Sequence, residues 1–350
     1  MPHRFSLKLA TPVVIIFGAG ASRGGLAGQP IPPPVDSEFF TVAARLTGHG
    51  TPALSKRVLR SVWDLYDRIE GVTLEQYYRE LETRASIASI AKSVGKPKDW
   101  ARRIVDLEEL IRRVYVHTTT EEKKGHRVPV SSGPHQAILD ALPEGSTILT
   151  FNYDMLIEES FRTATLWNPR DGFAIRLPGI THDWARGWLR RHNVPRTATS
   201  KVHLLKLHGS LGWASYPNRQ VKLKARPYYV SQGRFESVSV LAPGLNKRIH
   251  VNPYRQFWRE ARLRLQGCKS LLIVGYSLPD TDLLARALFS EVVRLRHAQE
   301  AYLSLLVLAD PATTVRERFV KLLTPALGPI GRVVHFESLE KLAPFSAPHD

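Results

Sequence analysis

The segment Thr150-Phe151-Asn152-Tyr153-Asp154 holds two polar residues that could act at one site. Asn152 and Asp154 are two residues apart, so their side chains point to the same side if the chain stays extended. An amide at such a place can position water or hydroxyl groups. Asp154 can also cap a helix over residues 155–161, and the two roles are compatible. We therefore take Asn152 and Asp154 as candidate site residues.

His208 is the candidate base. It follows an apolar run and precedes the flexible Gly209. An imidazole at this place can exchange protons near neutral pH. The chain has 13 histidines, and most histidines in proteins are surface or structural groups. It is the position of His208 in the sequence that singles it out.

Three further segments have residues suited to a nucleotide. The glycines of Gly18-Ala19-Gly20-Ala21-Ser22 let backbone amides approach a phosphate, although the segment also fits a plain tight turn. It is not the dehydrogenase pattern G-x-G-x-x-G, because Arg23 occupies the third glycine position. Gly275-Tyr276-Ser277-Leu278 offers amides and a hydroxyl, or an ordinary loop. Asp310 can bind a ribose or adenine, or cap the residues that follow.

Each of these segments comes directly after a short apolar run. Such runs are typical of buried strands in a parallel sheet. The carboxyl ends of these strands meet at one edge, where open α/β sheets bind their ligands. The runs cover residues 13–17, 148–150, 204–207, 271–274 and 305–308. The sequence therefore predicts one site built from five distant segments.

The remaining pattern completes the predicted fold, which is a doubly wound, Rossmann-like α/β sheet with a helical insertion after its first strand. We assign residues 1–35 and 145–350 to the sheet domain and residues 36–144 to the insertion, which we expect to cover the crevice. Thr73 and Gln76 form a capping-box pattern before an insertion helix. We expect a last strand over residues 332–336, a charged loop over 121–129, and irregular structure over 166–200 and 215–248.

The composition limits the class of protein. There are 49 Lys and Arg residues against 32 Asp and Glu, a net charge of +17. This charge favours nucleic acid, anionic ligands or an acidic partner, or simply solvated basic faces with a subunit interface. A single cysteine, Cys268, excludes an intramolecular disulfide and a four-cysteine zinc site. No apolar run approaches the roughly 20 residues that span a bilayer, so we expect a cytoplasmic protein without a metal.

In this order the signatures resemble those of the sirtuin superfamily, specifically the bacterial SIR2-like branch of anti-phage defence proteins. The motifs G-A-G-x-S, T-x-N-x-D, H-G and G-x-S-L match Gly18–Ser22, Thr150–Asp154, His208–Gly209 and Gly275–Leu278. The longer segment from Ile273 to Asp282 also resembles this branch. Two features depart from the protein deacylases, namely the missing four-cysteine zinc module and the replacement of their arginine motif by residues 29–37.

The resemblance implies an NAD+ glycohydrolase that releases nicotinamide and ADP-ribose, with NAD as substrate and no metal. Its implied catalytic residues are Asn152, His208 and Asp154. The implied NAD-binding residues are Gly18, Ala19, Gly20, Ala21, Ser22, Thr150, Asn152, Asp154, Gly275, Tyr276, Ser277, Leu278 and Asp310. The nicotinamide nitrogen of NAD+ is already cationic, so it leaves as a neutral group without a general acid.

Other functions remain open at this point. The same signatures fit an NAD-dependent deacylase or ADP-ribosyltransferase, in which another nucleophile replaces water. They also fit a non-catalytic NAD or ADP-ribose sensor in a DNA-associated complex. The family analogy implies a homo-oligomer and a separately encoded defence subunit, for which a HerA-like DNA-translocating ATPase is one candidate. Nucleic acid would then be contacted through the partner, and no membrane is involved.

Overall fold

The structure is a computed structural model. It describes residues 8–46, 52–91, 96–123, 126–161, 166–175, 183–195, 197–215, 221–223, 238–240 and 252–342. None of the helices within these ranges is long and apolar enough to cross a membrane.

A six-stranded parallel sheet forms the centre of the protein, with the order β11-β10-β9-β1-β4-β5. Its strands are β1 (Val13–Phe17), β4 (Thr147–Thr150), β5 (His203–Lys206), β9 (Ser270–Val274), β10 (Leu303–Ala309) and β11 (Leu327–Phe336). Every residue of β1, β4 and β9 is buried. Burial on both faces explains why these strands read as continuous apolar runs and not as alternating ones.

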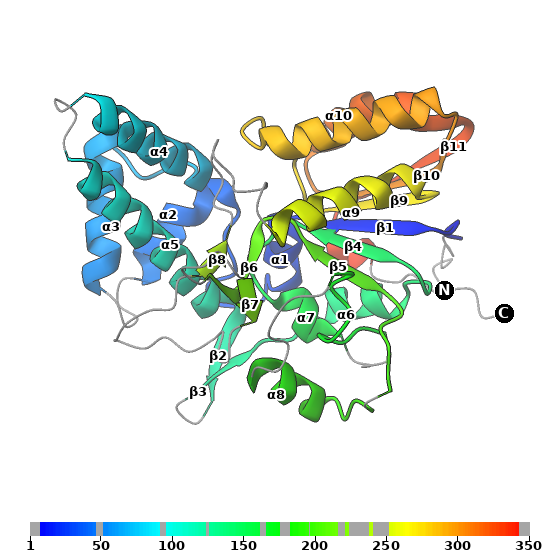
Figure 1. The fold of residues 1–350 in the computed structure, drawn as a ribbon, viewed down its shortest axis with the longest axis horizontal. Coiled ribbons are helices and arrows are strands. Elements are labelled where there is room, and N and C mark those ends of the chain that lie inside the picture. Colours follow the sequence, from blue (N-terminus) through cyan, green and yellow to red (C-terminus); the bar gives the residue numbers. More distant parts are fainter. Residues whose placement is uncertain are drawn as a thin grey trace.

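Helices cover both faces of this sheet (Figure 1). The group α9 (Tyr254–Gly267), α10 (Leu283–Ala298) and α11 (Thr313–Leu323) packs together. A second group contains α1 (Ala19–Gly25), α6 (Gly133–Asp140), α7 (Leu156–Ser160) and α12 (Leu339–Leu342). In Figure 1 α9 and α10 lie above the sheet, and α1, α6 and α7 lie below it. The predicted doubly wound, Rossmann-like fold is confirmed.

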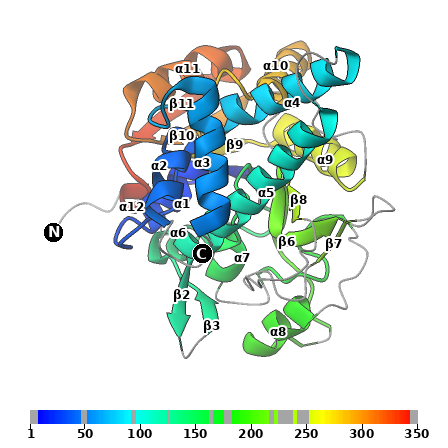
Figure 2. The ribbon, with the colours of Figure 1, turned by 90° about the vertical axis from the view of Figure 1, so that its left-hand side faces the viewer.

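The segment between β1 and β4 is largely helical (Figure 2). Its helices share a hydrophobic core of their own. A 3-10 turn at Asp36–Glu38 precedes α2 (Phe39–Arg45), α3 (Pro52–Tyr66), α4 (Leu74–Ile90) and α5 (Pro97–Thr119). The capping box of α4 is present, since Thr73 accepts from the Gln76 amide and the Gln76 side chain accepts from the Thr73 amide. Tyr153 and Leu211, from outside this segment, complete its core, so the two parts of the protein share apolar contacts.

Three expectations about loops are wrong. Residues 121–129 contain most of an antiparallel hairpin of β2 (Thr120–Lys123) and β3 (His126–Pro129). The segment 166–200, expected to be irregular, contains α8 (Asp183–Arg191). The segment 215–248, also expected to be irregular, contains β7 (Val221–Leu223) and β8 (Val238–Val240), which form a three-stranded sheet with β6 (Gly209–Ser215). The exposed, charged side chains of β2 hide its strand character, because an apolar pattern appears only where a strand face is buried.

Candidate functional site

A cavity of about 430 Å³ lies at the carboxyl ends of the parallel strands. Eight of the residues singled out in the sequence line it, namely Ala19, Gly20, Asn152, His208, Gly275, Tyr276, Ser277 and Asp310. The other six are buried, namely Gly18, Ala21, Ser22, Thr150, Asp154 and Leu278. The structure thus brings residues far apart in the sequence to one cavity, such as Gly20 and Asp310, which are 290 positions apart.

The glycine-rich segment Gly18–Ser22, which begins α1, packs backbone to backbone against the end of β9 and Gly275. Gly20 N donates to Gly275 O at 2.9 Å, and Gly18 N donates to Val274 O at 3.0 Å. A Cβ on Gly18 would lie 2.5 Å from Gly275 O, and one on Gly275 would lie 2.1 Å from Ala21 N. Glycine is therefore required here by this close approach. The amides of Gly18 and Gly20 are committed to protein carbonyls, which reduces the number of donors the turn offers a phosphate.

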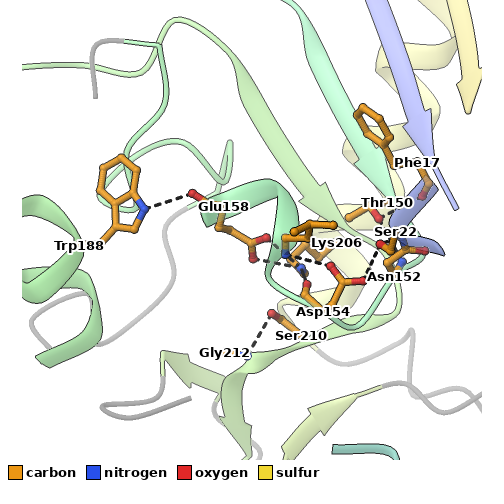
Figure 3. A network of polar contacts seen from close by, with 11 residues as sticks. Phe17, Ser22, Thr150, Asn152, Asp154, Glu158, Trp188, Lys206, Ser210 and Gly212 are labelled. Atoms are coloured by element: carbon orange, nitrogen blue, oxygen red, sulfur yellow. Dashed lines mark hydrogen bonds and ion pairs between the residues drawn. The ribbon is translucent and has the colours of Figure 1, made fainter. Parts of the chain in front are cut away.

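Asn152 is held by hydrogen bonds that connect two of the signatures, Gly18–Ser22 and Thr150–Asp154 (Figure 3). Its Nδ2 donates to Gly18 O at 2.8 Å and to Ser22 Oγ at 3.0 Å. Ser22 Oγ in turn donates to Asp154 Oδ2 at 2.7 Å, while Asp154 Oδ1 accepts from Leu156 N at 2.9 Å. Because the amide nitrogen is used in this way, Asn152 presents its amide oxygen to a ligand. Asp154 acts one step behind, holding Ser22 and the start of α7.

A buried ion pair between Lys206 and Glu158 is connected to this network at Asp154. Lys206 Nζ lies 3.0 Å from Glu158 Oε1, and both side chains are 1% exposed. Lys206 also donates to the Asp154 carbonyl oxygen, and Trp188 Nε1 donates to the Glu158 carbonyl oxygen at 3.1 Å. Burial raises the pKa of Glu158, and the charge of Lys206 opposes that effect. Figure 3 shows this pair linking α7 and β5 to Asp154.

His208 is 6% exposed and is packed among aromatic rings. Its ring centroid lies 5.0 Å from that of Phe151 and 6.3 Å from those of Tyr153 and Trp258. Its Nε2 lies 3.4 Å from Oδ2 of Asp282, at the N-terminus of α10. Sequence reasoning quoted Asp282 only as part of a motif and gave it no role. The sequence feature that could have indicated Asp282 is its position as a possible helix cap after the Gly275–Leu278 segment.

The helical insertion supplies one wall of the cavity. Asp36, Thr73, Glu75 and Tyr115 are among the lining residues. Asp36 Oδ1 accepts from Glu75 N at 3.1 Å, and burial raises the pKa of the Asp36 carboxyl. Glu75 also accepts a hydrogen bond from Thr281 of the loop after β9. The position of Asp36 beside α4 could not be predicted, because Asp36 and Glu75 are 39 positions apart in the sequence.

The opposite end of the cavity lies where β9 and β10 finish. Asp310 Oδ1 accepts from Ala312 N at 2.9 Å, and burial raises the pKa of this carboxyl. Arg318 of α11 donates to Ser277 O, in the loop after β9, at 2.5 Å. The charged side chains lining the cavity, within the described ranges, are all acidic: Asp36, Glu75, Asp282 and Asp310. The basic surplus of the chain is therefore not concentrated in this site.

A family model for the SIR2-like domain matches residues 146–323, half of the chain. The chain belongs to the SIR2-like family. The matched region runs from β4 to α11 and includes Asn152, His208, Gly275 and Asp310, whereas the Gly18–Ser22 turn lies before it. Membership supports an NAD-binding function of the sirtuin type.

Solved structures of Sir2 proteins are similar to this chain at low identity. A Sir2 homologue in complex with NAD is 11% identical, with 95% of this chain and 86% of that chain covered and a TM-score of 0.42. A variant of a Sir2 homologue in complex with ADP-ribose is 13% identical, with 95% and 88% covered and a TM-score of 0.40. No curated protein matches the sequence. Among the described residues, no cluster of His, Cys, Asp and Glu side chains is suited to a metal ion.

Proposed function

We propose that this SIR2-like protein hydrolyses NAD+ to nicotinamide and ADP-ribose. The observation that carries the proposal is the course of the cavity along the edge of the sheet. Asp310 after β10 lies toward one end, Ala19 and Gly20 after β1 lie in the middle, and Asn152 and His208 after β4 and β5 lie toward the other. A dinucleotide laid along this edge has its pyrophosphate near Ala19 and Gly20 and its adenosine near Asp310.

The opposite nucleoside then lies beside Asn152 and His208. In the reaction the bond between ribose C1′ and the nicotinamide nitrogen breaks, and its electrons neutralise the departing ring. Water forms the new bond to C1′ and loses a proton, which His208 can accept. The Asn152 amide oxygen can hold the water or a ribose hydroxyl in line. Nearby carboxylates, including Asp282 and Glu75, favour the positive charge that develops on the ribose.

The decisive experiment compares three single variants. Asn152→Ala and His208→Ala each remove a proposed catalytic side chain, and nicotinamide release should fall on the order of 10²- to 10⁴-fold in the histidine variant. His203→Ala is the matched control, because His203 lies at the start of β5, the strand that leads to His208, and does not line the cavity. Nicotinamide and ADP-ribose are measured by liquid chromatography and mass spectrometry. Wild-type rates in both site variants, or a wild-type complex inert toward NAD+ under every activating condition, would contradict the proposal.

The products also separate hydrolysis from the other sirtuin reactions. Free ADP-ribose formed without an acceptor supports hydrolysis. O-acyl-ADP-ribose from an acylated peptide, or ADP-ribose attached to a protein, would instead identify a deacylase or a transferase.

We extend the proposal to an NAD-depleting role in anti-phage defence, with activity controlled by self-assembly or by a partner subunit. A monomer by light scattering that turns over NAD+ at full rate would argue against that control.

A further inference from the structure

We propose that Asp282 is the residue that positions His208, through the Nε2 atom of the imidazole. This inference rests on the proposed function, in which His208 is a catalytic residue. The two side chains come from different parts of the sheet, because His208 follows β5 at one edge and Asp282 begins α10 after β9. The strands β1 and β4 lie between β9 and β5 in the sheet, and the loop after β9 carries the Asp282 carboxylate past their ends to His208.

The carboxylate of Asp282 is fixed in place at both of its oxygens. Oδ1 accepts from Ala285 N at 3.4 Å, as the N-cap of α10. Oδ2 accepts from the hydroxyl of Tyr276 at 3.0 Å and faces His208 Nε2 at 3.4 Å. The Asp282 side chain is 3% exposed. A carboxylate held in this way leaves little freedom to the imidazole that faces it.

Tyr276 is suited to remain a donor in this arrangement. Burial, followed by the nearby charge of Asp282, raises the pKa of its phenol well above the usual range. Its ring stacks on Phe151 with centroids 4.2 Å apart, and Phe151 contacts His208 edge-on. The phenol therefore stays protonated and directs its hydrogen to Asp282. The same aromatic stack restricts rotation of the His208 ring.

The geometry assigns Nε2 of His208 to the carboxylate of Asp282. With Nε2 protonated toward Asp282, Nδ1 is the nitrogen that can accept a proton from water. When it does so, the imidazolium is stabilised by the carboxylate, as in other histidine–carboxylate pairs. Asp282 thus acts through His208 and is a positioning residue. Its loss should lower kcat more than it changes KM, because the pair interacts most strongly when the histidine is charged.

The test uses Asp282→Asn, which keeps the side-chain shape and remains a good helix cap. Tyr276→Phe removes only the hydroxyl that holds the carboxylate. Asp280→Asn is the matched control on the same loop, since its side chain is 82% exposed and pairs with Arg286. The protein is labelled with 15N-histidine, and the His208 signals are assigned by their loss in His208→Ala. Nitrogen shifts and nicotinamide release are measured for every variant.

We expect the wild-type spectrum to show His208 protonated at Nε2, and Asp282→Asn to shift both ring nitrogens. Nicotinamide release in that variant should fall on the order of 10- to 100-fold in kcat, part of what a positioned base contributes, with KM changed less than about threefold. Tyr276→Phe should give a smaller change in the same direction, and Asp280→Asn none. Unchanged His208 shifts in Asp282→Asn would overturn the inference. The spectrum decides this even if the protein proves inert toward NAD+, so the two proposals can fail separately.

Discussion

Removing one partner of the buried Lys206–Glu158 pair should destabilise the protein strongly. Both side chains are 1% exposed, so a single substitution leaves the other group buried without its counter-charge. Breaking such a pair typically costs about 3–5 kcal/mol, which is a large part of the roughly 5–15 kcal/mol that stabilises a folded protein. We expect a loss of this size for Lys206→Met at pH 8. The double variant Lys206→Met/Glu158→Gln should recover part of it, because no unpaired charge remains.

The loss in Lys206→Met should depend on pH with a definite sign. Burial raises the pKa of Glu158 from its usual value of 4.5, and removing Lys206 takes away the charge that opposes this shift. The folded state therefore holds the Glu158 proton more tightly than the unfolded state does. In the variant, the stabilisation that comes from protonated Glu158 is fully present below pH 4.5 and is lost as the pH rises through the folded-state pKa of Glu158. The variant should accordingly be less impaired at pH 5 than at pH 8, relative to wild type.

Urea denaturation followed by circular dichroism measures these free energies at the two pH values. Lys201→Met is the control, because Lys201 pairs with Glu144 at the surface, with side chains 48% and 70% exposed. Such an exposed pair contributes only about 0–1 kcal/mol. A loss below about 1 kcal/mol for Lys206→Met at pH 8, with no recovery at pH 5, would refute the reasoning from burial.

Three further outcomes follow from single contacts. Gly275→Ala should destabilise the protein and prevent NAD+ binding in calorimetry, because φ is +58° and the new Cβ would lie 2.1 Å from Ala21 N; Gly267→Ala, with open space around it, should not. Cys268 should react with Ellman's reagent only after unfolding, since burial raises its pKa to about 11. Wild type should cleave NAD+ faster than NADP+, because repulsion between the 2′-phosphate of NADP+ and the Asp310 carboxylate weakens its binding by roughly 1–4 kcal/mol. Asp310→Asn removes this repulsion and should reduce the difference in rate between the two substrates.

The central part of the fold could be predicted from local sequence. The runs that became β1, β4, β5, β9 and β10 are apolar because both faces of a parallel sheet are buried. Their endings in glycine, asparagine, histidine and aspartate marked the edge where the cavity lies. The capping box at Thr73 was equally readable, since it involves residues only three positions apart. Interactions of this range depend on the local chain and little else.

The hairpin β2–β3 and helix α8 show where local reasoning failed. The charged residues of β2 are exposed, so they have no apolar period. Within β6 the apolar Leu211 and Trp213 alternate with Ser210 and Gly212, but all of these residues are buried and the glycines obscured the pattern. Both β2 and β8 contact α5, a helix of the insertion. The surface on which such short elements pack is not encoded in their own residues.

The sequence by itself determined which residue types stand at the ends of the strands, and hence that Asn152, His208 and Asp310 would share one edge. The tertiary structure decided what those residues can do. It placed Asp282 beside His208, brought Asp36 and Glu75 into the cavity, and joined the Gly18 and Gly20 amides to the end of β9 and Gly275. These contacts join segments far apart in the chain. They depend on how loops run between elements, which no periodicity in the sequence specifies.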